Sequence, residues 1–471
     1  MNQLLKQDTL NVINIGLTRF AEDLKKQGTK VVQVDWKPVA GGNRKIMEAL
    51  DKIEKVRDKI EEANAEAIGR IKAARPMLAD IELAGNCIPN MTKTTILHAG
   101  PYIKWEDMCG PMKGAIIGAV LFEDLAKSEK EALSLIESQA VTFAPCHEYG
   151  AVGPMAGVLS ASMPVHIILD EVNGRYAYCS INEGLGKVLR FGAYSKEVLK
   201  HLRWMRDEFM PAMKKALALT DGIDLKLITA QALQMGDECH NRNKASTGLF
   251  YKQISTLLLQ AVEDKNILKR VLEFIANNDH YFLNLSMPAC KVSLEAGHGV
   301  PYSTIVTVMA RNGVEFGIKV SGLDKKEWFT HTSEYIEGLY FPGYSKEDAN
   351  RDIGDSAITE TMGIGGFAMG GAPAIVQFVG GTTEDALNIS RSMYSICDDI
   401  NPAYAIPSLD FKGSALGIDI LKVAESGILP VVNTGIAHRE AGIGQIGAGI
   451  VSPPMECFYQ AISAFVKEYD L

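Results

Sequence analysis

The chain has 471 residues, of which 47% are hydrophobic and 22% are charged. This composition is typical of a folded globular protein, and it excludes a disordered chain, a coiled coil and a collagen-like fibre. The 48 basic and 57 acidic residues give a net charge of −9, which disfavours a protein that coats nucleic acid. At about 150 residues per domain, the length predicts roughly three domains.

The N-terminal sequence MNQLLKQDTLNVINIG lacks the basic segment and apolar run of a signal peptide. The longest apolar run, at 114–122, is far shorter than the ~20 residues that cross a bilayer. Eight cysteines occur singly and never as CxxC, which disfavours a zinc ribbon and a disulfide framework. We therefore expect a cytoplasmic protein with reduced thiols and with neither a membrane nor a nucleic-acid partner.

The 43 glycines are unevenly distributed along the chain. Residues 81–190 hold 11 of them and residues 338–449 hold 18, whereas residues 191–290 hold only 4. Glycine is used where the backbone turns sharply or approaches another group closely. The sequence therefore predicts two glycine-rich site regions separated by a helical block.

The first elements predict a small β-α-β unit. Two β-type runs, 12–15 and 31–34, flank a segment whose apolar residues recur at helical spacing. Only Gly16 lies at the first turn, so the unit is Rossmann-like in order but lacks the GxGxxG fingerprint. A nucleotide or CoA site here and a purely structural unit remain alternatives.

Later segments extend this pattern. Asn43 is expected to cap a helix with an apolar stripe from Ile46 to Ile60, and Ser195 is expected to cap another helix. Asn312-Gly313 predicts the turn of a hairpin within 303–321.

Together these elements predict an α+β multidomain fold. It comprises an N-terminal α/β unit with a long helix (1–85), a mixed α/β core in two parts (86–190 and 291–471) and an inserted helical bundle (191–290). We expect the two parts of the core to converge on one cleft.

One short pattern occurs twice, as Gly110-Pro-Met-Lys-Gly114 and Gly153-Pro-Met-Ala-Gly157. Glycine is an acceptable N-cap and proline is favoured at the first helical position, so both copies predict a helix start. Two such ends would offer free N–H groups to an anion, and Lys113 would add a positive charge. Tight helix-packing turns are the alternative.

A histidine precedes each copy of the pattern: His98 the first and His147 the second. Both are candidates for proton transfer, because histidine titrates near neutral pH. Structural histidines are the alternative. A thiolate nucleophile at Cys109 or Cys146 is also conceivable, but nothing in the sequence pairs either cysteine with a base.

Two further segments are dense in polar groups. In the segment 182–190, the side chains that can orient a phosphate or carboxylate are Asn182, Glu183, Lys187 and Arg190. The segment 235–244 lies in an otherwise apolar block, and its candidates are Asp237, Glu238, His240, Asn241, Arg242 and Asn243. Polar groups at this density need partners or a ligand. Metal binding is disfavoured, because neighbouring residues are poorly placed to bind one ion together.

The C-terminal glycine-rich region contains three more candidate segments. Asp355 and Ser356 are expected to cap a helix, ahead of glycines at 363–371 that resemble a cradle. Asn433, His438 and Gln445 follow short apolar runs, in the manner of site residues at a strand-turn-helix junction. With the 235–244 segment, the two glycine-rich regions would form three walls of one cleft.

Six segments, in order along the whole chain, resemble the YahG/YlbE-like family. They are HAGPYIKWEDMCGPMKGAIIGA, GAVGPMAGVLSASMPV, NEGLGKVLRFGA, MGDECHNRNKAST, DIGDSAITETMGIGGFAM and NTGIAHREAGIGQIGAGI. The resemblance implies an AllG-type subunit of an oxamate carbamoyltransferase. This enzyme exchanges oxalurate and phosphate with oxamate and carbamoyl phosphate in anaerobic allantoin degradation, a purine catabolic route. The resemblance also implies an FdrA-like partner and a third small subunit.

Carbamoyl transfer suits the candidate residues. The reaction develops an oxyanion that needs N–H or cationic donors, and its leaving nitrogen needs a proton. His98, His147 and His240 are the candidate proton donors. Gly110, Lys113, Gly153 and the polar residues named above are the candidate substrate contacts. The chemistry demands no metal or other cofactor, and a homodimer is the default expectation. A non-catalytic assembly subunit and an acid–CoA or nucleotide-linked ligase component remain the alternatives.

Overall fold

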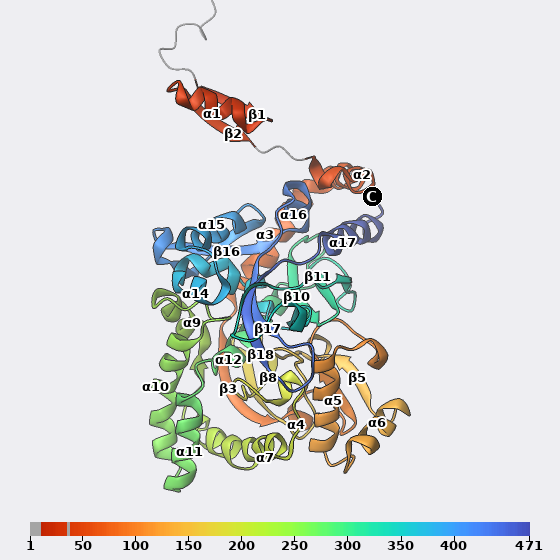
Figure 1. Ribbon diagram of the computed structural model, residues 1–471, viewed down its shortest axis with the longest axis vertical. Helices are drawn as coiled ribbons and strands as arrows, with labels where there is room; N and C mark the ends of the chain where they lie inside the picture. Colours follow the sequence, from red (N-terminus) through yellow and green to blue (C-terminus); the bar gives the residue numbers. More distant parts are fainter. Residues whose placement is uncertain (1–10, 35–37) are drawn as a thin grey trace, which may run out of the picture.

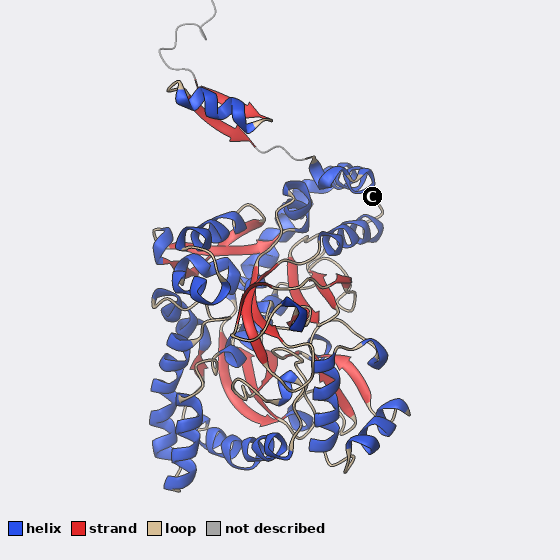
Figure 2. Ribbon diagram, in the orientation of Figure 1, coloured by secondary structure: helices blue, strands red, loops and turns tan. Residues whose placement is uncertain are grey.

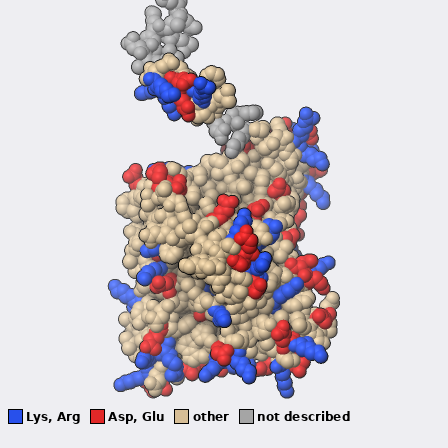
Figure 3. All heavy atoms as spheres, in the orientation of Figure 1, with Lys and Arg blue, Asp and Glu red and all other residues tan. Residues whose placement is uncertain are grey.

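The structure is a computed structural model that describes residues 11–34 and 38–471 (Figure 1). The chain forms both helices and several separate sheets, as Figure 2 shows, and the predicted α+β class is confirmed. On the face in Figure 3, acidic and basic side chains are interspersed. Within the described ranges, no helix combines the length and apolar character needed to cross a membrane.

The N-terminal β-α-β unit forms as predicted. It consists of β1 (Asn11–Ile15), α1 (Thr18–Lys26) and β2 (Lys30–Val34). The two strands are parallel, with Asn11 opposite Lys30 and Ile15 opposite Val34. Among the described strands, β1 and β2 pair only with each other.

The long N-terminal helix is divided in two. α2 (Arg44–Ile53) begins where the Asn43 side chain accepts hydrogen bonds from the backbone N–H groups of Lys45 and Ile46, as expected of an N-cap. A 3-10 turn at Glu54–Val56 then leads into α3 (Arg57–Ala73). The apolar stripe is buried on both sides of this turn, at Ile53 and at Ile60.

The first part of the core contains a five-stranded sheet in the order β6-β8-β7-β3-β9. Its strands are β3 (Pro76–Leu83), β6 (Ala151–Val152), β7 (Pro164–Asp170), β8 (Arg175–Ser180) and β9 (Ile223–Asp224). A separate parallel pair joins β4 (Thr95–His98) to β5 (Thr142–Pro145). The helices of this part are α4 (Ala84–Cys87), α5 (Gly110–Phe122) and α6 (Glu129–Glu137).

The glycine-poor block is helical. Its helices are α7 (Lys196–Trp204), α8 (Met210–Leu217), α9 (Leu225–Gln234), α10 (Lys244–Ala261), α11 (Lys265–Ala276) and α12 (Leu283–Ala296), with a π-helical stretch at Met205–Phe209. The Ser195 side chain caps α7, as predicted. α12 is buried along nearly its whole length, because it packs against β8, β7 and β3 and also against α3 and α13 (Ile358–Thr361). It therefore lies at the centre of the molecule.

The second part of the core contains three smaller sheets. One has the order β12-β11-β10-β14, another the order β13-β18-β17, and β15 pairs with β16. The strands are β10 (Val306–Asn312), β11 (Glu315–Val320), β12 (Phe329–Thr332), β13 (Glu337–Tyr340), β14 (Ile353–Gly354), β15 (Cys397–Ile406), β16 (Lys412–Ile418), β17 (Val432–Ala437) and β18 (Gln445–Val451). The helices are α13 (Ile358–Thr361), α14 (Val376–Val379), α15 (Thr383–Met393), α16 (Ile420–Ser426) and α17 (Met455–Glu468). The hairpin predicted around Asn312-Gly313 is confirmed as β10 and β11.

The two copies of the Gly-Pro-Met pattern differ in structure. The first begins α5, as predicted, with Pro111 in the first turn. The prediction of a second helix start is wrong. Met155 and Gly157 have φ values of 54° and 61°, in the left-handed region, so no right-handed helix can continue from this turn. Pro154 instead forms an isolated bridge with Gly354.

The two parts of the core meet backbone to backbone at Gly100. Its φ is +78°, and a Cβ there would lie 2.3 Å from the carbonyl carbon of Arg311 and from the backbone nitrogen of Asn312. Glycine is required here for both conformation and space.

This contact predicts different costs for alanine at two glycines. Gly174 has a similar φ of +64°, but no atom lies within 4 Å of its added Cβ. Gly174→Ala should lower the apparent free energy of unfolding in urea by about 1 kcal/mol. Gly100→Ala should lower it by about 3 kcal/mol or more, because rigid backbone must also move. Equal effects at the two positions would contradict this account of Gly100.

Candidate functional site

The carboxylate of Asp355 joins three segments that are far apart in the sequence. Its Oδ1 accepts a hydrogen bond from the backbone N–H of Gly100 at 2.8 Å, and its Oδ2 accepts one from Gly153 at 2.9 Å. The side chain is fully buried. The prediction that Asp355 and Ser356 cap a helix is therefore wrong, because the Asp355 carboxylate is engaged by other segments and Ala357 precedes α13.

His98 and His147 lie beside this carboxylate. His147 Nε2 is 3.4 Å from Asp355 Oδ1, and His98 Nδ1 is 2.9 Å from the carbonyl oxygen of Ala99. Burial lowers the pKa of both imidazoles, while the Asp355 charge opposes that shift. Both rings are therefore neutral at pH 7.

Behind Asp355, a buried arginine fixes the same loop. Arg311 donates two hydrogen bonds to the Asp352 carboxylate, at 2.6 and 2.8 Å, and one to the carbonyl oxygen of Gly354 at 2.7 Å. It also reaches Thr434 Oγ1 on β17 at 3.2 Å. This fork holds the start of the Gly354–Glu360 segment against β10 and β17.

The 237–243 segment meets the C-terminal glycine-rich region at one buried pair. His240 Nδ1 lies 2.8 and 3.0 Å from the two carboxylate oxygens of Glu360 on α13. Glu360 also accepts hydrogen bonds from the backbone N–H of Gly366 at 2.8 Å and from Thr359 Oγ1 at 3.0 Å. A Cβ at Gly365 would fall 2.1 Å from Glu360 Oε1, so only glycine fits there.

This pairing determines what His240 can do. The carboxylate holds the proton on Nδ1 and fixes the plane of the ring. The other nitrogen, Nε2, makes no hydrogen bond with any residue of the described ranges, although the side chain is only 3% exposed. This arrangement leaves Nε2 available to a ligand.

Unpaired amide groups occur in the residues next to this pair. The backbone N–H of Asn433 donates to Glu360 Oε1 at 3.3 Å, yet both side-chain polar atoms of Asn433 are buried without a partner in the described structure. Asn243 Nδ2 donates to the carbonyl oxygen of His240, while its Oδ1 is likewise buried and unpaired. Buried polar groups are rarely left unpaired in folded proteins. These groups are what a polar ligand beside His240 would need.

Two carboxylates fix the conformation of the loop that carries His240. Glu238 accepts hydrogen bonds from the backbone N–H groups of His240, at 2.9 Å, and of Arg242. Asp237 accepts hydrogen bonds from the backbone N–H and hydroxyl of Ser246, at 2.8 and 3.0 Å. Burial raises the pKa of both acids, and the nearby Glu360 charge raises that of Glu238 further.

The 182–190 segment contacts residues 278–284, which lead into and begin α12. Arg190 donates to the carbonyl oxygen of Gly184 at 2.7 Å, and its Nε is buried without a partner in the described structure. Burial lowers the pKa of His280 to about 4, and the charges of Arg190 and His240 contribute to this shift. Asn182 donates to the carbonyl oxygen of His280 at 3.0 Å. These contacts place His280 close to both predicted segments.

Other predicted residues lie elsewhere or have structural partners. Lys113 donates to the carbonyl oxygen of Glu106 at 2.9 Å, Lys187 is exposed, and Gln445 donates to the carbonyl oxygen of Gly447 at 3.0 Å. Gly110 is packed against the backbone of Arg439, where an added Cβ would lie 2.3 Å from the carbonyl oxygen. These contacts leave the α5 N-terminus covered by protein.

Several more predicted residues have defined partners. Glu183 accepts from the backbone of Leu189 and Arg190, Ser356 Oγ accepts from Arg311, and His438 Nδ1 accepts from the backbone of Glu440. Asn241 differs, because its buried Nδ2 has no partner among the described residues. Asn433 lies inside β17, which continues into β18, so the predicted strand-turn-helix junction is wrong and the segment is a β-hairpin.

The two cysteines considered as nucleophiles are poorly suited to that role. Burial raises the pKa of Cys109 to about 11 and that of Cys146 well above its usual value. Because the thiolate is the reactive form, neither group is activated near neutral pH.

Sequence reasoning missed Glu360, Arg311 and Asp352. Arg311 carried a usable signal, because a lone charge in the apolar run STIVTVMAR must find a partner when the strand is buried. No sequence feature pointed to Glu360 other than its place at the end of the GDSAITE segment.

Comparison with known proteins assigns the family. A family model described as oxamate carbamoyltransferase subunit AllG matches residues 141–356. The oxamate carbamoyltransferase subunit AllG of Escherichia coli (strain K12) is 48% identical over 411 residues, covering 87% of this chain and 98% of that protein. YahG of the same organism, whose name assigns no activity, is 50% identical over 471 residues and the full length of both chains. The chain belongs to the YahG/AllG-like family.

A solved member of similar sequence supports the fold. The crystal structure of a conserved protein of unknown function from Enterococcus faecalis V583 is 51% identical to this chain, with a TM-score of 0.86. It covers 88% of this chain and 99% of its own. The family resemblance predicted from the six sequence segments is thus confirmed. The AllG match includes His147, Arg190, His240 and Asp355, whereas Glu360 and Asn433 lie beyond its end.

The Arg311–Asp352 pair gives a stability prediction. Asp352→Asn leaves a fully buried guanidinium without its counter-charge and should lower the free energy of unfolding by about 3–5 kcal/mol. Glu384→Gln removes the carboxylate of an exposed pair with Arg391 and should cost less than about 1 kcal/mol. Urea unfolding of both variants checks this difference. An Asp352→Asn cost as small as that of Glu384→Gln would contradict it.

Proposed function

We propose that this chain is a subunit of an oxamate carbamoyltransferase-type complex. The complex transfers a carbamoyl group between oxalurate and phosphate, giving oxamate and carbamoyl phosphate, in anaerobic allantoin degradation. The observation that carries the proposal is the 48% identity with AllG over 411 residues. In this proposal the chain acts in the cytoplasm, as a homodimer, with an FdrA-like subunit and a third small subunit.

The proposed chemistry centres on His240. An oxygen of hydrogen phosphate attacks the carbamoyl carbon of oxalurate, the C–N bond to the oxamate nitrogen breaks, and the phosphate proton passes to that nitrogen. His240 Nε2 carries this proton from one atom to the other. Glu360 is the positioning residue, since its carboxylate holds Nδ1 and stabilises the imidazolium that forms transiently.

The neighbouring groups suit the remaining demands of the reaction. The unpaired amides of Asn433 and Asn243 can hold the ureido group of oxalurate, and the guanidinium groups of Arg190 and Arg242 can bind its carboxylate or the phosphate. His98 and His147 are held beside Asp355, so in this proposal they support the loop and do not transfer the reacting proton.

Two variants of the central pair test the proposal in the assembled complex with the FdrA-like partner. His240→Asn should lower the kcat for carbamoyl phosphate formation by about 10²–10⁴-fold, because the proton carrier is lost. Glu360→Gln should lower kcat by about 10–100-fold with little change in KM, because ring orientation and charge support are lost. The exposed Glu440→Gln is the matched control and should leave kcat unchanged.

Three readouts separate catalysis from folding and assembly. His240→Asn should unfold at the same temperature as the wild type and should still co-purify with the partner. The pH profile of kcat should differ between Glu360→Gln and the wild type. Full turnover by His240→Asn would instead indicate a non-catalytic assembly subunit. An intact complex that makes no carbamoyl phosphate from oxalurate and phosphate would reject the proposed reaction.

A further inference from the structure

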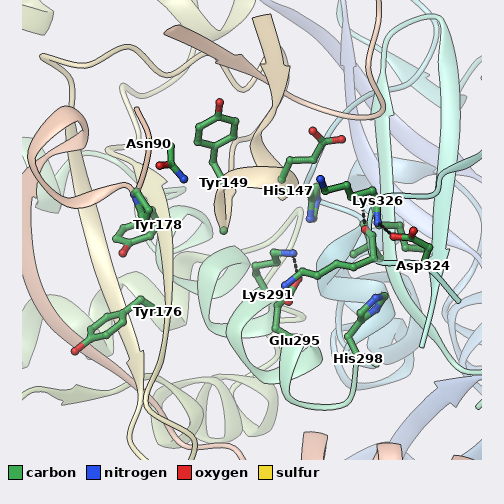
Figure 4. Close-up of a pocket in the computed structure, with 16 residues that line it drawn as sticks. Asn90, His147, Tyr149, Tyr176, Tyr178, Lys291, Glu295, His298, Asp324 and Lys326 are labelled. Atoms are coloured by element: carbon green, nitrogen blue, oxygen red, sulfur yellow. Dashed lines mark hydrogen bonds and ion pairs between the residues drawn. The ribbon is translucent and has the colours of Figure 1, made fainter. Parts of the chain in front are cut away.

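A second group of chemically active side chains lies around a cavity away from His240. The cavity has a volume of about 670 Å³, which is in the range of small-molecule sites. Figure 4 shows Asn90, Tyr149, Tyr176 and Tyr178 along one side, and His147, His298, Lys291 and Lys326 along the other. Four lysines line it: Lys291 of α12, Lys319 of β11, and Lys325 and Lys326 of the following loop.

Two of these lysines are buried to an unusual degree. The Lys291 side chain is 1% exposed, and Lys319 is 4% exposed. Lysine is almost never fully buried without a paired charge, since its ammonium loses its hydration. The cavity wall therefore carries desolvated positive charge.

The available carboxylates do not neutralise all of this charge. Glu295 contacts Lys291 and also accepts from Lys325 Nζ at 2.6 Å, so one carboxylate serves two ammonium groups. Lys319 Nζ donates only to the carbonyl oxygen of Lys325, at 2.6 Å, and lies 4.4 Å from the centre of the Trp328 ring. Within the described structure, Lys319 has no ion pair.

Unpaired histidine nitrogens lie on the same wall. His298 Nδ1 is 2.7 Å from Thr307 Oγ1, while its Nε2 is buried without a partner among the described residues. His147 Nδ1 likewise has no partner there, whereas its Nε2 lies 3.4 Å from Asp355 Oδ1. Burial lowers the pKa of His298 to about 4, so a neutral ring offers hydrogen-bonding capacity in addition to the lysine charges.

We propose that this cavity binds the phosphate dianion, either free or as the phosphate group of a larger ligand. Lys319 and Lys291 supply its charge-assisted hydrogen bonds, and the cavity leaves room for an organic part along the tyrosine side. The site is distinct from the His240 centre, although α12 contacts both. Ser286 of α12 donates to the carbonyl oxygen of Cys239 at 2.9 Å, and Lys291 follows about 7 Å farther along the helix axis.

Direct binding measurements test this site without any turnover. Phosphate is also a substrate of the proposed reaction, so the Lys319 variants decide whether the binding belongs to this cavity. Titration calorimetry of the full chain with inorganic phosphate at pH 7.5 should show saturable binding. Lys319→Met should weaken it about tenfold or more, as expected for the loss of one charge-assisted bond. Lys319→Arg should retain most of the affinity. Lys252→Met, at an exposed lysine of α10, is the matched control and should bind as the wild type does.

The pH dependence gives a second readout. Burial, followed by the Lys291 charge, lowers the pKa of Lys319 to about 8. Affinity should therefore fall roughly tenfold or more between pH 7.5 and pH 9.5 in the wild type, and much less in Lys319→Met. The other ionisable groups of the wall are common to both proteins. They are Lys291, Glu295, His298, Asp324, Lys325, Lys326, His147, Glu148, Tyr149, Tyr176 and Tyr178.

Separate titrations identify the source of the phosphate. Carbamoyl phosphate, AMP and coenzyme A are each compared with inorganic phosphate, and tighter binding of one that is still weakened by Lys319→Met identifies the larger ligand. Thermal unfolding confirms that each variant is folded. The inference is overturned if no phosphate compound binds, if Lys319→Met binds as tightly as the wild type, or if only carboxylates such as oxamate bind.

Discussion

The buried carboxylate of Asp355 is the interaction on which the functional region depends. By accepting the N–H groups of Gly100 and Gly153 on its two oxygens, it fixes three chain segments to one another within hydrogen-bond distance. The Arg311–Asp352 fork holds the same loop from behind. Because α13 follows this loop directly, the position of Glu360, and with it that of His240, depends on this arrangement.

The glycine distribution has a physical explanation in this packing. Gly100 lies close to the backbone of Arg311 and Asn312, Gly153 lies close to the backbone of Gly157, and Gly365 lies close to the Glu360 carboxylate. In each case a Cβ would lie within 2.4 Å of another atom. At these three positions of the two glycine-rich regions, backbone approaches backbone or a buried carboxylate, and the polar segment between the regions supplies His240.

Local chemistry made part of this structure predictable. The β-α-β unit, the caps at Asn43 and Ser195 and the Asn312-Gly313 turn depend on neighbouring residues, so the sequence was sufficient. The second Gly-Pro-Met turn was mispredicted, because its left-handed backbone is imposed by the distant Gly354 segment. Glu360 and the lysine cavity were missed for the same reason. Their interactions form only between residues that are distant in the sequence and are brought together by tertiary folding.

The central claim is that His240, held by Glu360, is where the carbamoyl group is transferred. A crystal structure of this chain with oxamate and carbamoyl phosphate tests it most directly. The account predicts oxamate density with a polar atom within hydrogen-bond distance of His240 Nε2 and with contacts to the amides of Asn433 or Asn243. Oxamate bound only in the lysine cavity, or at a surface remote from His240, would contradict it.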